Sequence, residues 1–220
     1  PDAPSKFKSS DVEDTHFILH WGEPDYLPGD LTGFEIKLIR DPKLTVPPWC
    51  PDLSEITDTI KNIDGDVFSW NYTNAMPYST YRTKIQAKTQ AGWGKTSDEL
   101  KVQTAPGAPG PVANLNYSIQ PNPSDADLLD FFLTWARPCD LNGERIEFYN
   151  ITAVGERRNY EDHTFIINKP IEDFDCINDV CSMMLKLKEE YTYTFYVAGR
   201  VQNHQELGEK NTITAMFPPG

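Results

Sequence analysis

The 220-residue chain contains 20 Lys and Arg against 33 Asp and Glu, which gives a formal net charge of −13. This acidic balance argues against a nucleic-acid-binding protein, because such a protein needs clustered cations to neutralise phosphates. The 39% hydrophobic fraction is high enough to fill a core, and no apolar run approaches the ~20 residues of a membrane-spanning helix. Because the chain starts at Pro1 and ends in Pro218-Pro219-Gly220, a sequence typical of linkers, we expect it to be part of a longer protein.

In the first half of the chain, apolar and polar residues alternate with a period of two, which predicts half-buried strands. The segments with this pattern are Phe17–Trp21, Leu31–Leu38 and Tyr81–Ala87. Phe68, Trp70 and Tyr72 also share one parity, which leaves Asn71 facing solvent. No stretch shows a 3.6-residue period over three turns, so helix is expected only in short pieces, such as around residues 52–61.

The segment Ala105–Pro111 is rich in Pro and Gly and has no periodicity, which is typical of a short, fairly stiff linker. It divides the chain into residues 1–105 and 106–220. The strand pattern of the first part recurs in the second, where Trp135 follows Trp21 by 114 residues and Tyr193 follows Tyr81 by 112. We therefore interpret the chain as two copies of one unit, each built from many short strands.

Each copy resembles a fibronectin type III domain. In that family a core Trp on the second strand is followed by Pro, the third strand opens with an apolar-x-x-aromatic pattern, and a tyrosine opens the sixth strand. The matching residues are Trp21, Pro24, Leu31, Phe34 and Tyr81 in the first copy, and Trp135, Pro138, Ile146, Tyr149 and Tyr193 in the second. The resemblance implies an all-β fold class, with two seven-stranded immunoglobulin-like (fibronectin type III) β-sandwiches in tandem. The structural core residues that it implies are Trp21, Trp135, Tyr81 and Tyr193.

Three N-glycosylation sequons lie in the chain, at Asn71-Tyr-Thr73, Asn116-Tyr-Ser118 and Asn150-Ile-Thr152. Sequons also arise by chance, but three of them together with an even number of cysteines favour an oxidising, secretory route. We therefore expect glycosylation at Asn71, Asn116 and Asn150.

The family topology implies a pairing for the four cysteines. It places the loop that carries Cys50 at the pole of the first domain that meets the second domain, and Cys139 in a loop at the facing pole. We therefore favour an inter-domain disulfide between Cys50 and Cys139 and a local one between Cys176 and Cys181. Because the loop of Cys176 lies at the same pole as Cys139, the pairs Cys139–Cys176 and Cys139–Cys181 remain open alternatives.

The sequence contains no motif that indicates catalysis. Gly92-Trp-Gly94-Lys95-Thr96 includes a Gly-Lys-Thr triplet, but Thr89 stands where a phosphate-binding loop needs glycine. The acidic run Glu172–Asp179 lacks the glycine and the terminal glutamate of a calcium-binding loop. We therefore expect no catalytic residue, no metal site and no cofactor in this chain, and we interpret it as a non-enzymatic fragment.

The resemblance implies an extracellular ligand-binding or adhesion module that also acts as a spacer, in the ectodomain of a single-pass plasma-membrane receptor. Within that class, the ectodomain of a receptor-type protein tyrosine phosphatase is the first expectation, so the full-length protein could carry a cytoplasmic phosphatase or kinase domain. The expected partner is a protein ligand or receptor at the cell surface, with no nucleic acid and no membrane insertion of this fragment. The outward-facing aromatic residues that could contact a partner are Trp93, Trp49 and Tyr78.

Two other interpretations remain open. A cytokine-receptor-like module is disfavoured, because the first copy lacks paired cysteines and the chain has no Trp-Ser-x-Trp-Ser motif. An accessory binding module of a secreted enzyme would be favoured by carbohydrate binding. For Trp49, packing beside Cys50 is the alternative to a contact with a partner.

Overall fold

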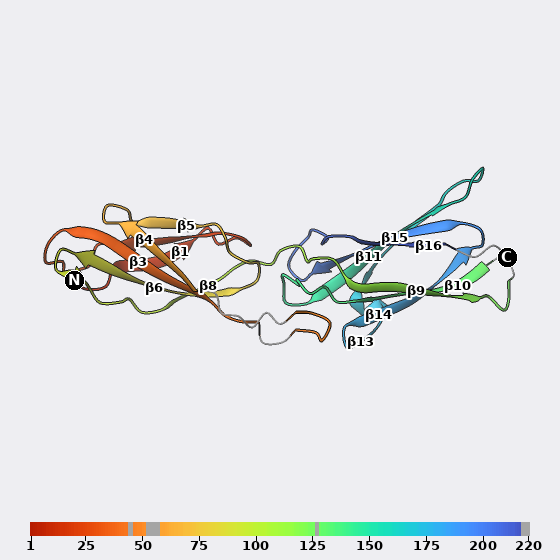
Figure 1. Cartoon of the computed structure of the whole chain (residues 1–220), viewed down its shortest axis with the longest axis horizontal. Helices are drawn as coiled ribbons and strands as arrows, with labels where there is room; N and C mark the ends of the chain where they lie inside the picture. The colour runs from red at the N-terminus through yellow and green to blue at the C-terminus, as the bar shows by residue number, and fades with distance from the viewer. Residues whose placement is uncertain (44–45, 52–57, 126–127, 217–220) are drawn as a thin grey trace. The chain divides into compact units, whose positions relative to one another are not determined.

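The computed structural model describes residues 1–43, 46–51, 58–125 and 128–216, and in these ranges the regular structure is almost entirely β-strand (Figure 1). The chain divides into two compact units. The first unit comprises Pro1–Thr45 and Asp52–Ala105, and the second comprises Val46–Pro51 and Pro106–Gly220. The change of unit after Ala105 coincides with the start of the Pro- and Gly-rich segment. The short segment Val46–Pro51, by contrast, belongs to the second unit although it lies within the first copy of the sequence pattern.

The first unit consists of two antiparallel sheets. One sheet has the order β1 (Ser5–Ser10), β2 (Phe17–Gly22), β5 (Ser69–Tyr72). The other has the order β4 (Asp58–Asp64), β3 (Leu31–Arg40), β6 (Thr80–Thr89), β7 (Gly92–Trp93), and β8 (Leu100–Gln103) also pairs with β6. Because β7 and β8 pair with the same strand, they are two pieces of the single last strand that a seven-stranded sandwich has. The interruption falls between Trp93 and Leu100.

The second unit repeats this architecture. One sheet has the order β13 (Asp175–Ile177), β14 (Val180–Lys188), β10 (Leu128–Ala136), β9 (Ala113–Pro121). The other has the order β12 (His163–Pro170), β11 (Ile146–Glu156), β15 (Thr192–Val201), β16 (Asn211–Ala215). A single turn of 3₁₀ helix, η1 (Ile171–Asp173), follows β12. The short strand β13 is an addition to the seven strands expected from the sequence.

Each unit has its own aromatic core, as the alternating patterns predict. Trp21 and Trp135 are 5% and 0% exposed. The Trp21 ring meets the Phe34 ring edge-on at 5.6 Å, and the Trp135 ring meets the Tyr149 ring edge-on at 5.4 Å. Rings in this geometry attract one another beyond the effect of their buried area. In each unit, the sheet that contains β3 or β11 therefore closes over the tryptophan of the other sheet.

A buried tyrosine fixes the loop before β6 and the loop before β15. The Tyr81 hydroxyl accepts the backbone N–H of Met76 at 2.8 Å, and the Tyr193 hydroxyl accepts that of Lys188 at 3.0 Å. Both tyrosines are nearly inaccessible to solvent. These are the tyrosine corners expected from the resemblance.

The expectation of a short helix around residues 52–61 is wrong for residues 58–61, which lie in β4. Residues 58–63 pair in register with residues 34–39 of β3, and the hydrogen bonds of that ladder outweigh a weak local preference. Residues 52–57 lie outside the described part of the chain.

Candidate functional site

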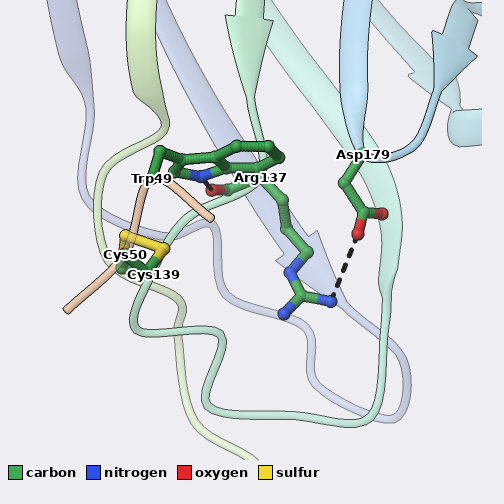
Figure 2. Close-up of a disulfide and its surroundings, with 5 residues drawn as sticks. All are labelled: Trp49, Cys50, Arg137, Cys139 and Asp179. Carbon is green, nitrogen blue, oxygen red and sulfur yellow. Dashed lines mark hydrogen bonds and ion pairs between the residues drawn. A yellow bond between two sulfur atoms is a disulfide. The ribbon is translucent and has the colours of Figure 1, made fainter. Parts of the chain in front are cut away.

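A disulfide anchors the segment Val46–Pro51 to the second unit. Cys50 comes from the segment after β3 and is bonded to Cys139 in the loop after β10, with their Cα atoms 5.4 Å apart (Figure 2). Beside this bond, the indole N–H of Trp49 donates to the backbone carbonyl of Arg137 at 3.1 Å. Among the described residues, the segment is thus held to the second unit by one covalent bond and one hydrogen bond on neighbouring residues. The Cys50–Cys139 pair is the one favoured from the sequence.

Arg137 connects this loop to the tip of the hairpin formed by β13 and β14. Its backbone N–H donates to the carbonyl oxygen of Asp179 at 2.9 Å, and its guanidinium lies 3.5 Å from the Asp179 carboxylate (Figure 2). The ion pair is partly exposed and contributes little by itself. Together with the backbone bond, however, it fixes the distance between the disulfide-anchored loop and the hairpin.

The second disulfide clips that hairpin directly behind its turn. Cys176 and Cys181 are register partners with Cα atoms 4.0 Å apart. The two turn residues, Asn178 and Asp179, both have positive φ values, 50° and 67°, as a type I′ turn requires. The residues between the clip and the turn, Ile177 and Val180, are 71% and 44% exposed. The hairpin therefore presents two apolar side chains on a tip that is covalently constrained.

The Pro- and Gly-rich segment after Ala105 is fastened to the second unit by backbone hydrogen bonds. The N–H groups of Gly107 and Gly110 donate to the carbonyls of Asn142 and Asp140, each at 2.8 Å. On the other side the N–H of Glu209 donates to the carbonyl of Pro109 at 3.0 Å. This segment is thus part of the second domain rather than a free linker.

The three aromatic residues singled out in the sequence do not form one site. Trp93 is 44% exposed in β7, and the ammonium group of Lys88 lies 5.3 Å from its ring centroid. Tyr78 is 36% exposed and precedes β6, whereas Trp93 pairs near the other end of that strand. Trp49 lies in the second unit, is only partly exposed and donates its indole N–H to the Arg137 carbonyl. This fits the alternative in which Trp49 packs beside Cys50 instead of contacting a partner. Of the three, Trp93 has the most exposed side chain.

The three sequon asparagines lie on strands. Asn71 in β5 and Asn116 in β9 are exposed, whereas Asn150 is partly buried in β11, an inner strand of its sheet. The Asn116 side-chain oxygen accepts the N–H of Tyr117 at 2.9 Å.

Sequence reasoning missed a polar contact in the second unit. The Nδ1 atom of His163 lies 2.6 Å from the Tyr193 hydroxyl. Burial, and to a smaller extent the charge of Lys188, lowers the pKa of His163. The sequence held no signal for this pair, because the two residues are 30 positions apart on strands that do not pair with each other.

Within the described ranges, no group of three or more His, Cys, Asp or Glu side chains could hold a metal ion. The same ranges contain no helix that is both long and apolar enough to cross a membrane.

Two sandwiches with buried tryptophans and tyrosine corners define a module of the immunoglobulin-like β class. Residues 2–103 match the model of the fibronectin type III domain family, so the first unit belongs to that family. The chain also superposes on the chicken CNTN1 FN1-FN3 domains with a TM-score of 0.56 at 15% identity, over 97% of this chain and 65% of that one. This likeness shows that the second unit shares the fold.

The chain is also similar to two phosphatases and to Protein sidekick. The chain is 25% identical to Tyrosine-protein phosphatase 99A of Drosophila melanogaster over 69% of its length, and 24% identical to Phosphatidylinositol phosphatase PTPRQ of Rattus norvegicus over 71%. It is 24% identical to Protein sidekick of Drosophila melanogaster over 96% of its length. The matches cover only 10%, 7% and 9% of these three proteins, so the chain corresponds to a small part of each.

Proposed function

We propose that the chain is part of the extracellular portion of a single-pass cell-surface receptor, with fibronectin type III domains at residues 1–105 and 106–220. In this proposal the two domains act as a spacer and bind a protein on a cell surface. The observation that carries it is the Cys50–Cys139 bond, since a structural disulfide that ties a loop of one repeat to the next needs an oxidising compartment. The relatedness to receptor-type phosphatases supports the same assignment.

The chain has a fold without catalytic machinery of its own. In the proposed receptor these domains set the spacing and bind the partner, and any phosphatase domain belongs to another part of the protein. The clipped hairpin is the proposed contact surface, because Ile177 and Val180 are apolar, exposed and held in place by the disulfide behind them. A preordered loop loses little entropy on binding, which raises affinity.

The test is staining of intact cells with the secreted, tagged chain. We expect binding to cells that express the partner, and loss of that binding in the double variant Ile177→Asp/Val180→Asp. Ile60→Asp in the first unit is the matched control, because Ile60 is equally apolar and 59% exposed. Retention of the Cys50–Cys139 bond in a non-reducing peptide map shows that each variant is folded. Equal staining by the hairpin variant and the wild type would remove the hairpin from the proposal.

One observation favours a second candidate, an accessory carbohydrate-binding module of a secreted enzyme. Trp93 borders an open groove whose polar lining includes Asn62, Asp64 and Lys88, and an exposed ring beside polar groups is an arrangement that suits a sugar. A glycan array with the wild type and Trp93→Ala decides this. Specific glycan binding that disappears in the variant would favour the enzyme module over the receptor.

A further inference from the structure

Around Asn150, the outer face of the β12–β11–β15–β16 sheet in the second unit is mostly uncharged. Within its central register, the outward-facing residues are Thr164, Ile166, Asn168, Asn150, Thr152, Val154, Thr194, Tyr196, Ala198, Thr212 and Thr214. No charged side chain occurs among them, although 24% of the chain is charged. The corresponding face of the first unit carries Glu35, Lys37, Arg82, Lys84 and Lys88. On the same face of the second unit the charged register positions are Arg200, diagonal to Asn150, and Glu156 at the end of β11, so this face carries fewer charges than that of the first unit.

Asn150 occupies the middle of this face. Its register partners are Asn168 on β12 and Ala198 on β15. The Asn150 side-chain oxygen lies 3.5 Å from the Thr152 hydroxyl, the other polar residue of its sequon. The Nδ2 atom, to which an N-glycan is attached, takes part in none of the hydrogen bonds found within the described residues.

The apolar residues around Asn150 differ in how they are covered. The Arg200 guanidinium lies 4.3 Å from the Phe148 ring centroid, and the Lys210 ammonium lies 6.0 Å from that of Tyr196. Ile166, which pairs with Thr152, is 65% exposed. It lies on β12, one of the two edge strands of the sheet. An exposed apolar edge strand is a template for pairing with another chain, and proteins usually protect such edges.

We infer that Asn150 carries an N-linked glycan whose first sugars lie across β11 and β12 and cover Ile166. Asn150 is next to Asn168 and diagonal to Ile166, and diagonal cross-strand neighbours are within reach of large groups. A sugar ring can lay its C–H groups on Ile166 while its hydroxyls remain in water. The β12 side of the face suits such a cover, because its outward residues Thr164, Ile166 and Asn168 are uncharged and no charged group among them has to lose its hydration. This inference rests on the proposed extracellular location.

The experiment compares the secreted wild type with two variants that remove the Asn150 sequon, Asn150→Gln and Thr152→Ala. The second of these keeps the asparagine. Asn71→Gln, which removes a different sequon, is the matched control. Peptide mass mapping before and after enzymatic removal of N-glycans gives the occupancy of each site. Hydrogen exchange then reports on β12, and light scattering on association. We expect several-fold faster exchange in β12 and concentration-dependent self-association in both Asn150-sequon variants but not in the control. Adding Ile166→Lys to Asn150→Gln should restore the monomer.

The outcomes separate this inference from the proposed function. Glycans on Asn71 or Asn116 but not on Asn150 would overturn the inference and leave the extracellular assignment intact. A secreted chain without glycans at any of the three sites would overturn both the inference and the proposed extracellular location. If Asn150 is occupied but its loss changes neither exchange in β12 nor association, the glycan does not cover the strand. Self-association of the fully glycosylated wild type through β12 would also overturn the inference.

Discussion

Lys37 of β3 and Lys84 of β6 lie directly opposite each other on the two central strands of the first unit's larger sheet. Both side chains are exposed, on the face that points away from the core, and neither forms an ion pair with any described residue. Like charges in directly opposed positions destabilise a sheet. The pair is therefore a local weakness in an otherwise well-packed domain.

Replacing one of these lysines by an acid should stabilise the first unit. For Lys84→Glu we expect an increase of about 0.2–1 kcal/mol in the free energy of unfolding, because a repulsive cross-strand pair becomes attractive. Urea unfolding at low salt measures it, and the gain should shrink in high salt. Lys8→Glu in β1, which makes the same charge change on the other sheet, is the control. An equal effect in both variants would mean that net charge, and not the pair, decides.

The two tyrosine corners should differ in strength. Tyr81→Phe removes the acceptor for one backbone N–H, and leaving a buried donor unsatisfied costs about 1–3 kcal/mol. Tyr193→Phe removes the acceptor of Lys188 N–H and also the partner of His163, so its cost should be larger. Chemical unfolding of each variant, followed separately for the two domains, measures both losses. Equal losses would show that the His163 contact adds nothing to stability.

The second unit should lose stability in mild acid. Burial lowers the pKa of His163 in the folded state. In the unfolded chain this histidine has the ordinary pKa of about 6.5. Below that pH the unfolded chain therefore binds more protons than the folded one. The contribution of this histidine is thus complete above that pH and is lost as the pH falls toward the folded pKa. Thermal unfolding between neutral and mildly acidic pH should show the slope in the wild type and a shallower one in His163→Gln. His16→Gln, which removes a histidine from the first unit and leaves His163 in place, is the control for the transition of the second unit.

Loss of the Cys50–Cys139 bond should release the segment around Trp49. In Cys50→Ser/Cys139→Ser the Trp49–Arg137 hydrogen bond is the one bond among the described residues that still holds this segment to the second unit. We therefore expect red-shifted tryptophan fluorescence and new cleavage by trypsin or chymotrypsin near residues 46–51. A native disulfide contributes about 2–4 kcal/mol to stability, and urea unfolding should show a loss of that size. The control Cys176→Ser/Cys181→Ser leaves this segment in place. Unchanged fluorescence in the first variant would mean that the hydrogen bond alone holds Trp49.

Local patterns in the sequence were sufficient to predict the sandwich fold, because a strand that is buried on one face alternates apolar and polar residues with a period of two. Trp21 and Trp135 stand in such alternating segments, and the proline that follows each marks the end of a strand. The split of the last strand into β7 and β8 was not foreseen. Neither was β13, a three-residue strand too short for its alternation to be recognised.

By itself the sequence determined that the chain folds as two similar β-sandwiches with buried tryptophans, since those features depend on neighbours within a few residues. Only the tertiary structure decided which distant residues meet. Cys50 and Cys139 are separated by 89 positions, and Lys37 and Lys84 are opposed because of the register between two strands. The pairing of His163 with Tyr193 and the uncharged neighbours of Asn150 on β12 have the same origin. Such contacts depend on register and loop paths, which the free energy of the whole fold selects and no short stretch of sequence encodes.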